Sequence, residues 1–199
     1  YKLCKTIKED INISHIPVIL LTARDDRQSQ ISGYKNGADG YLSKPFEVEM
    51  LMELIRNRLK NREYTKKRYL NAGLIPTPEE STISLTDETF LIKLNSIIQE
   101  NIENSNLGIQ FICQEVGLGR SSLYNKLKAL TGMGANEYIS KLRIEKAITL
   151  ISGTDMPFSE IAEKTGFTTP SYFSTAFKQY TGETPSQYKE RKKKGLADK

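Results

Sequence analysis

The sequence has no tryptophan, one histidine and two cysteines, and it does not begin with methionine. The single histidine, His15, is too little for a histidine-based metal site or a catalytic triad, so we interpret it as a surface or capping residue. Cys4 and Cys113 lie far apart among apolar residues and form no CxxC pair, which predicts two buried thiols in a reducing compartment. Because the chain starts at Tyr1, we interpret it as a fragment of a longer protein.

A long apolar run and a dominant charge are also missing. The longest apolar stretch, Ile16–Leu21, is far shorter than the roughly 18 residues of a membrane helix, so we expect a buried strand there. The net charge of +5 divides into +3 for residues 1–62, 0 for 63–85 and +2 for 86–199. No segment is strongly basic, so the bulk charge alone does not indicate nucleic-acid binding.

The first part of the sequence alternates between helical and strand patterns. Helical spacing appears at residues 3–10, 25–37 and 47–62, whereas 15–22 and 40–43 have the apolar, β-branched composition of buried strands. The order α-β-α-β-α indicates an α/β domain with a parallel sheet. Two strands are too few to stand alone, so we interpret residues 1–62 as half of a domain.

The pattern changes after residue 62. Gly73, Pro76, Pro78 and a Ser/Thr-rich stretch predict a linker over residues 63–85. Residues 86–192 are expected to be entirely helical, with Thr86 as the N-cap of the first helix. Residues 193–199 form a short basic tail.

The helical part contains an internal repeat. The segments GLGRSSLYNKLKALTG (117–132) and GFTTPSYFSTAFKQYTG (166–182) align at a constant offset of 50 from the middle of each helix onward, and the second has one more residue in its turn. Each segment follows a short amphipathic stretch. A short helix, a glycine-centred turn and a second helix make a helix-turn-helix pattern.

The second helix of each copy has two faces. Leu123, Leu127 and Leu130 are expected to point inward in the first copy, and Phe173, Phe177 and Tyr180 in the second. The outward positions share helical spacing and small polar or basic character: Ser121, Tyr124, Asn125, Lys128, Ser171, Ser174, Thr175 and Lys178. Such side chains suit base edges in a major groove, and three basic residues with no acidic one between Arg120 and Asn136 suit its phosphates. The alternative is that these are solvated faces of an ordinary helical bundle.

Residues 86–192 resemble the DNA-binding domain of AraC-type transcription regulators, most specifically in EIAEKTGFTTPSYFSTAFKQYTGETPSQYK. The resemblance implies two helix-turn-helix units joined by a long helix over about residues 134–151 and two recognition helices on one face of double-stranded DNA. It assigns base contacts to Ser121, Ser122, Tyr124, Asn125, Ser171, Ser174 and Thr175. It assigns phosphate contacts to Arg120, Lys128 and Lys178. Pro170 stands where many relatives have a polar residue, which removes one base reader.

Residues 1–62 resemble the C-terminal half of a CheY-like phosphoacceptor receiver domain, through HIPVILLTA and GYKNGADGYLSKPF. The resemblance implies that Thr22 and Lys44 contact a phosphoryl group, that Tyr41 is the switching aromatic, and that the Lys44–Pro45 bond is cis. It places the phosphoacceptor aspartate and the acidic pair for Mg²⁺ upstream of residue 1, because Asp25, Asp26 and Asp39 occupy other positions. We therefore expect no cofactor in this chain, with Mg²⁺ only in an intact receiver.

Both halves together resemble the C-terminal end of hybrid two-component regulators of Bacteroidetes. This implies a sequence-specific transcription regulator of carbohydrate-utilisation genes, driven by a phosphorelay, with a kinase domain upstream and a parent anchored in the inner membrane. We expect this fragment itself to be cytoplasmic, homodimeric, without membrane contact and without enzymatic activity, since no triad, metal cluster or phosphate-binding glycine loop occurs in it. The alternative is a phosphorelay-linked interaction or dimerisation module that does not read bases.

Overall fold

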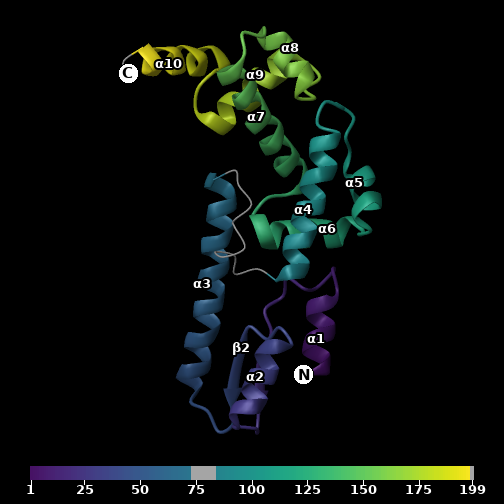
Figure 1. The fold of residues 1–199 in the computed structure, drawn as a ribbon, viewed down its shortest axis with the longest axis vertical. Coiled ribbons are helices and arrows are strands. Elements are labelled where there is room, and N and C mark those ends of the chain that lie inside the picture. Colours follow the sequence, from purple (N-terminus) through teal and green to yellow (C-terminus); the bar gives the residue numbers. More distant parts are fainter. Residues whose placement is uncertain (73–83, 198–199) are drawn as a thin grey trace. The chain divides into compact units, whose positions relative to one another are not determined.

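The computed structural model describes residues 1–72 and 84–197, which fall into two compact units. The first comprises Tyr1–Lys93 and Leu118–Met133, and the second comprises Leu94–Gly117 and Gly134–Lys199. Each unit is described by itself below (Figure 1). None of the described helices combines the length and apolar composition needed to cross a lipid bilayer.

The first unit begins with the predicted α/β order. Its elements are α1 (Lys2–Glu9), β1 (Ile19–Thr22), α2 (Arg27–Lys35), β2 (Gly40–Ser43) and α3 (Val48–Ala72). The two strands are parallel, with Ile19 opposite Gly40 and Thr22 opposite Ser43. The prediction of a parallel α/β segment is therefore confirmed, and both strands end at the same edge of the sheet.

Two boundaries in this segment differ from the sequence prediction. The first strand is limited to β1, because residues 11–15 form turns, with Ile16 N donating to Ile13 O at 2.9 Å. The expectation that it is buried is wrong, since Leu21 is 43% exposed. Helix α3 continues ten residues past the expected end at residue 62, because the first helix-breaking residue after that point is Gly73. The remainder of the predicted linker, residues 73–83, lies outside the described residues.

The first unit also contains the beginning of α4 (Leu85–Glu100) and the whole of α6 (Arg120–Thr131), and α3 packs against α6. The N-cap of α4 is Ser84 and not Thr86: the Ser84 hydroxyl accepts a hydrogen bond from Asp87 N at 3.2 Å. Thr86 instead donates its hydroxyl to Lys8 O in α1 at 3.0 Å. The helix thus begins earlier than predicted, and the threonine joins two elements far apart in sequence.

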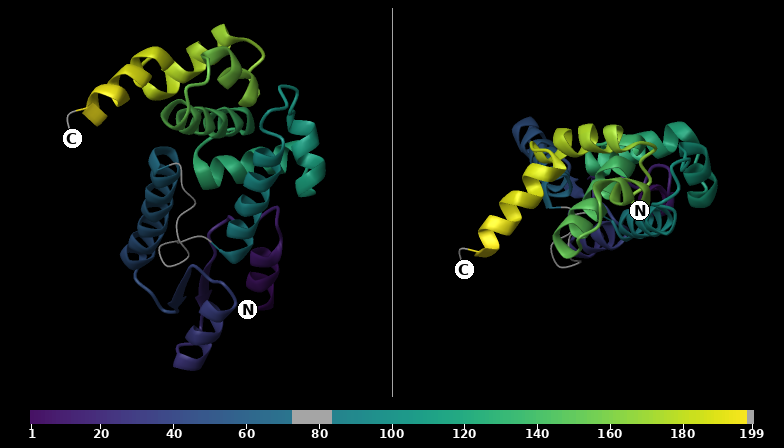
Figure 2. Two further views of the ribbon diagram at one scale, coloured as in Figure 1. Left: turned by 45° about the horizontal axis from the view of Figure 1, so that its top comes forward. Right: turned by 90° about the horizontal axis from the view of Figure 1, so that it is seen from above.

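The second unit consists of helices around an aromatic and aliphatic core. They are α5 (Ile109–Val116), α7 (Ala135–Gly153), α8 (Phe158–Lys164), α9 (Pro170–Thr181) and α10 (Pro185–Ala197), with the end of α4. Helices α7, α8 and α9 lie against one another, and α10 packs against α7 and α9 at its beginning and extends away from them toward its C-terminal end (Figures 1 and 2). The core residues are Ile144, Ala147, Ile151, Ile161, Ala162, Phe167, Phe173, Phe177 and Tyr188. The all-helical prediction is confirmed, and α7 is the expected long helix.

The turn between α8 and α9 requires glycine. Gly166 has φ +71°, and a Cβ there would lie 2.2 Å from the carbonyl oxygen of Ile102. The positive φ and the close approach of backbone both exclude a larger residue at this position. The conformation of the turn that leads into α9 therefore depends on glycine at position 166.

Candidate nucleic-acid interface

The two helices predicted to read DNA, α6 and α9, are each 12 residues long and end in the same way. Gly132 and Gly182 follow them in the left-handed conformation, with φ +79° and +83°. Their backbone N–H groups donate to Lys128 O and Lys178 O at 3.0 and 2.8 Å. The repeat with an offset of 50 seen in the sequence is therefore also a repeat of helix length and C-terminal cap.

The N-termini of the two helices differ. Helix α9 has a side-chain cap, because the Thr169 hydroxyl accepts from Tyr172 N at 3.1 Å, and Pro170 occupies the first helical position. Helix α6 begins after Gly119, which offers no side chain for capping. The proline that replaces a possible base reader is thus explained as a helix-starting residue.

The predicted reading residues are accessible. In α6, Arg120, Ser121, Tyr124, Asn125 and Lys128 are exposed and Ser122 is half-buried. In α9, Ser171, Thr175 and Lys178 are exposed and Ser174 is half-buried. Their contact with DNA remains a prediction. Neither helix contains a carboxylate, so no fixed negative charge within these helices opposes a phosphate backbone.

The inward faces follow the prediction with one exception. Leu123, Leu127, Leu130, Phe173 and Phe177 are buried. The aromatic rings of α9 form a chain of tilted contacts, in which Phe173 and Phe177 lie 5.7 Å apart between ring centroids and Phe177 and Tyr188 lie 5.6 Å apart. These rings hold α9 on its core and leave its polar face outward.

Tyr180 is the exception, because it is 42% exposed and does not point into the core. Its hydroxyl hydrogen-bonds to Glu145 Oε1 at 3.2 Å. Partial burial, together with the charge of Glu145, raises the pKa of Tyr180 to about 12. The Tyr180 hydroxyl therefore has a hydrogen-bond partner on α7, and the ring stays partly exposed where it makes this contact.

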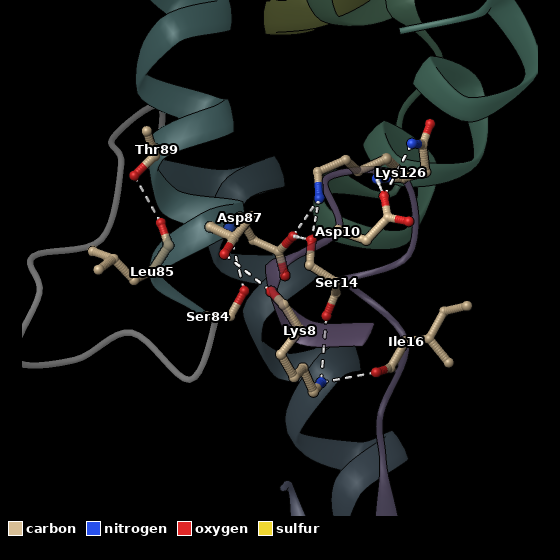
Figure 3. Close-up of polar contacts among 11 residues, drawn as sticks. Lys8, Asp10, Ser14, Ile16, Ser84, Leu85, Asp87, Thr89 and Lys126 are labelled. Carbon is tan, nitrogen blue, oxygen red and sulfur yellow. Dashed lines mark hydrogen bonds and ion pairs between the residues drawn. The ribbon is translucent and has the colours of Figure 1, made fainter. Parts of the chain in front are cut away.

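Lys126 lies on α6 but is not accessible to contact DNA. It is one of the three basic residues between Arg120 and Asn136 whose charge suited a phosphate-lined groove, but its side chain is completely buried. It forms an ion pair with Asp87 of α4 and donates to the Ser14 hydroxyl at 2.7 Å (Figure 3). The Ser14 hydroxyl in turn donates to Asp87 Oδ1 at 2.7 Å. The phosphate contacts assigned to α6, Arg120 and Lys128, do not include this lysine.

The cluster of Lys126, Asp87 and Ser14 was missed by the sequence analysis. A signal for part of it was present, since Lys126 falls three residues after Leu123 and next to Leu127, on the apolar face. Asp87 lies in the first turn of α4, where an acidic residue is common and does not indicate a buried ion pair. Nothing in the sequence links Ser14, more than 70 residues earlier, to either of them.

The predicted phosphorylation switch lies at the edge where the parallel strands end. Thr22 ends β1, and its carbonyl accepts from Lys44 N at 2.7 Å, so the two residues are neighbours in space. Lys44 is exposed, and the peptide bond between Lys44 and Pro45 is cis, as the receiver resemblance implied. Tyr41 is buried and donates its hydroxyl to Arg24 O at 2.7 Å, and burial raises its pKa to about 12.

Asp26 and Asp39 each have a partner within the described residues. Asp26 caps α2 by accepting from Ser29 N at 2.8 Å, and Asp39 pairs with Lys8 at 2.6 Å. Hydrogen bonding to Ser29 lowers the pKa of Asp26. Over residues 1–72 and 84–197, no group of three or more metal-ligating side chains comes together. The residues present therefore do not fit the Mg²⁺ site of a receiver.

Both parts of the chain match families of known proteins. Residues 1–56 match the response regulator receiver domain family, and residues 112–191 match the helix-turn-helix domain family. A protein named histidine kinase P4 from Formosa agariphila is 42% identical over 190 residues, which cover 96% of this chain and 14% of that protein. The transcriptional regulatory protein YesN of Bacillus subtilis is 33% identical over 121 residues, covering 59% of this chain and 32% of its own length.

Structural similarity supports the second assignment. A transcriptional regulator from Chromobacterium violaceum, described as containing an AraC-type DNA-binding domain, has 25% sequence identity and a TM-score of 0.50, covering 53% of this chain and 93% of that one. The chain spans well under half the length of the two sequence relatives. Residues 1–56 therefore match a response regulator receiver domain and residues 112–191 match a helix-turn-helix domain, and the second match agrees with the fold of an AraC-type DNA-binding domain.

Proposed function

We propose that this chain is a DNA-binding transcription regulator that reads specific base sequences through the exposed faces of α6 and α9. The observation that carries the proposal is the repetition of one helix, with the same length, the same glycine cap and an exposed polar face without carboxylates. Small hydroxyl and amide side chains on such a face match the donors and acceptors of a major groove. Arg120, Lys128 and Lys178 supply the charge for phosphate contacts.

The receiver segment supports regulation by phosphorylation in a longer protein. The backbone hydrogen bond between Thr22 and Lys44 supports this, because it makes neighbours of the hydroxyl-bearing and ammonium-bearing residues that the receiver resemblance assigns to a phosphoryl group. The relative named as a histidine kinase, of which this chain covers 14%, supports a kinase domain in the same polypeptide. The proposal extends to homodimeric binding, to carbohydrate-utilisation genes and to a membrane-anchored parent, as in the hybrid regulators that the sequence resembles.

Selection from random DNA duplexes tests base reading directly. The chain is expected to enrich a defined sequence, and its affinity for that sequence is expected to fall steeply with salt. Asn125→Ala should relax preference at particular base pairs by about 1–3 kcal/mol, whereas Lys128→Ala should weaken binding to all sequences alike. Gln99→Ala and Lys93→Ala, at exposed positions on α4, are matched controls.

The alternative, an interaction module without base readout, predicts a different result. In that case no sequence is enriched, and Asn125→Ala and Lys128→Ala affect every duplex equally. That outcome would remove the proposed readout by α6.

A further inference from the structure

A pocket of about 250 Å³ lies in the first unit, and none of the residues predicted to contact DNA lines it. Its walls come from the loop between α1 and β1, from α3, from the start of α4 and from the end of α6. Lys8, Ser14, Ser84 and Asp87, which line part of it, are drawn in Figure 3. The volume is below the roughly 300–1,000 Å³ of most pockets for drug-sized ligands, so any occupant is small.

The charges lining the pocket do not cancel. Both carboxylates in the wall are already paired, Asp39 with Lys8 at 2.6 Å and Asp87 with Lys126. Arg58 and Arg62 remain, both half-buried, and within the part of the chain that the structure describes neither has an ion-pair partner. The two guanidinium groups are therefore an uncompensated positive charge at this pocket.

The positions of Arg58 and Arg62 on α3 increase this charge density. Residues four apart lie one above the other on the same helix face, about 5–6 Å apart at Cβ, where like charges destabilise a helix. Arginine is the side chain best suited to bind phosphate, because its planar fork donates two parallel hydrogen bonds. An anion between the two guanidinium groups would convert their repulsion into attraction.

His15 contributes a second, independent indication of a ligand. It lines the same pocket, and its Nδ1 atom is buried without a hydrogen-bond partner. Buried polar atoms in folded proteins nearly always have a partner, so an unsatisfied one calls for an explanation. A neutral imidazole has one N–H to donate, and an oxyanion in the pocket would accept it.

We propose that this pocket binds a small phosphate-bearing anion, held by Arg58 and Arg62 with His15 at its side. This site is separate from the DNA-reading faces and from the Thr22–Lys44 edge, and the proposal does not depend on either. Because Ala129 and Leu130 of α6 also line the pocket, an occupant would contact both the receiver segment and a recognition helix.

The single histidine makes binding directly observable. In the 199-residue chain, the NMR signals of the His15 imidazole are unambiguous because no other histidine is present. Titration with inorganic phosphate at fixed pH and fixed ionic strength is expected to shift these signals saturably, whereas chloride at the same ionic strength leaves them unchanged. A linear, non-saturating response identical for both salts would overturn the proposal.

Variants assign the binding to the two arginines. Arg58→Gln combined with Arg62→Gln is expected to weaken phosphate binding by at least about tenfold. This is the change in affinity expected when at least one charge-assisted hydrogen bond is lost. Lys60→Gln, an exposed residue of the same helix outside the pocket, should bind like the parent chain. Circular dichroism verifies that each variant keeps its helix content. Equal weakening by Lys60→Gln, or none by the double variant, would refute the assignment.

The source of the phosphate is distinguished by a second titration. A sugar phosphate or glycerol phosphate that binds more tightly than inorganic phosphate, and still depends on Arg58 and Arg62, identifies a phosphate ester as the ligand class. Inorganic phosphate that binds as tightly as the esters identifies a free phosphate site. Both results support the proposal, and the absence of saturable binding by every one of these anions contradicts it.

Discussion

Lys126 and Asp87 form a buried ion pair that joins α6 to the beginning of α4, 39 residues earlier in the chain. The lysine side chain is wholly inaccessible and the aspartate side chain nearly so, and the Ser14 hydroxyl bridges them. A buried charge without its partner is far more costly than an exposed one. The orientation of the first recognition helix therefore depends on a polar contact beneath it as well as on its leucines.

Removal of one partner of this pair should strongly destabilise the chain. Lys126→Met or Asp87→Asn leaves a charge buried alone, and we expect the free energy of unfolding to fall by about 3–5 kcal/mol in each case. The double variant Lys126→Met/Asp87→Leu should recover much of this loss, because no unpaired charge remains. Urea unfolding followed by circular dichroism measures all three.

The matched control is Lys128→Met, two residues along the same helix but exposed. It should change the free energy of unfolding by less than about 0.5 kcal/mol. Single variants at Lys126 and Asp87 as stable as this control would show that the ion pair does not hold α6.

Gly166→Ala should be strongly destabilising. Its backbone has φ +71°, and the new methyl group would lie 2.2 Å from Ile102 O, so we expect a loss of at least about 2 kcal/mol in the free energy of unfolding. Gly153→Ala is the comparison, because that glycine is helical and open to solvent, and alanine there should stabilise by about 0.5–1 kcal/mol. Thermal unfolding of both variants checks the prediction, and a Gly166→Ala chain that melts with the parent would contradict the turn geometry.

Acidification should weaken the fold through His15. Burial lowers the pKa of its imidazole from the ordinary 6.5, and the positive charge of Lys126 adds to the effect; Arg62 and Lys8 act in the same direction, and only Asp87 opposes them. Below pH 6.5 the unfolded chain therefore binds more protons at this residue than the folded chain. The free energy of unfolding should fall as the pH drops from 6.5 toward the folded pKa, with no contribution above 6.5.

His15→Gln isolates this contribution. In phosphate-free buffer, urea unfolding at about pH 7.5 and about pH 5.5 should show a smaller loss of stability for the variant than for the parent chain. The same loss in both would mean that other groups account for the pH dependence.

Lys44→Ala should uncouple phosphorylation from transcription in a longer protein that carries the complete receiver. Lys44 is exposed and its backbone N–H donates to Thr22 O, at the edge where the receiver resemblance implies a phosphoryl group. We expect its ammonium to pair with that group, so its loss should abolish induction of a reporter gene without loss of DNA binding. Lys35→Ala, exposed at the end of α2, should leave induction intact. Unchanged induction by Lys44→Ala would contradict the role assigned to this edge.

Much of the architecture was predictable because it depends on local patterns. The parallel strands, the twelve-residue recognition helices and their glycine caps follow from apolar periodicity and from glycine at fixed positions. The length of α3 was missed because a change in composition was read as a break, although no breaker stands before Gly73. The cap of α4 was assigned to Thr86, two residues too late, because Ser84 and Thr86 are both competent caps.

The sequence by itself determined the two family assignments and the two faces of each recognition helix, since these reside in residues close together along the chain. Only the tertiary structure decided that Lys126 is buried with Asp87 and Ser14, that Tyr180 bonds to Glu145, and that Arg58, Arg62 and His15 line one pocket. The reason is physical: each of these arrangements joins side chains from elements distant in sequence, and the burial of Lys126 depends on the partners that those elements supply.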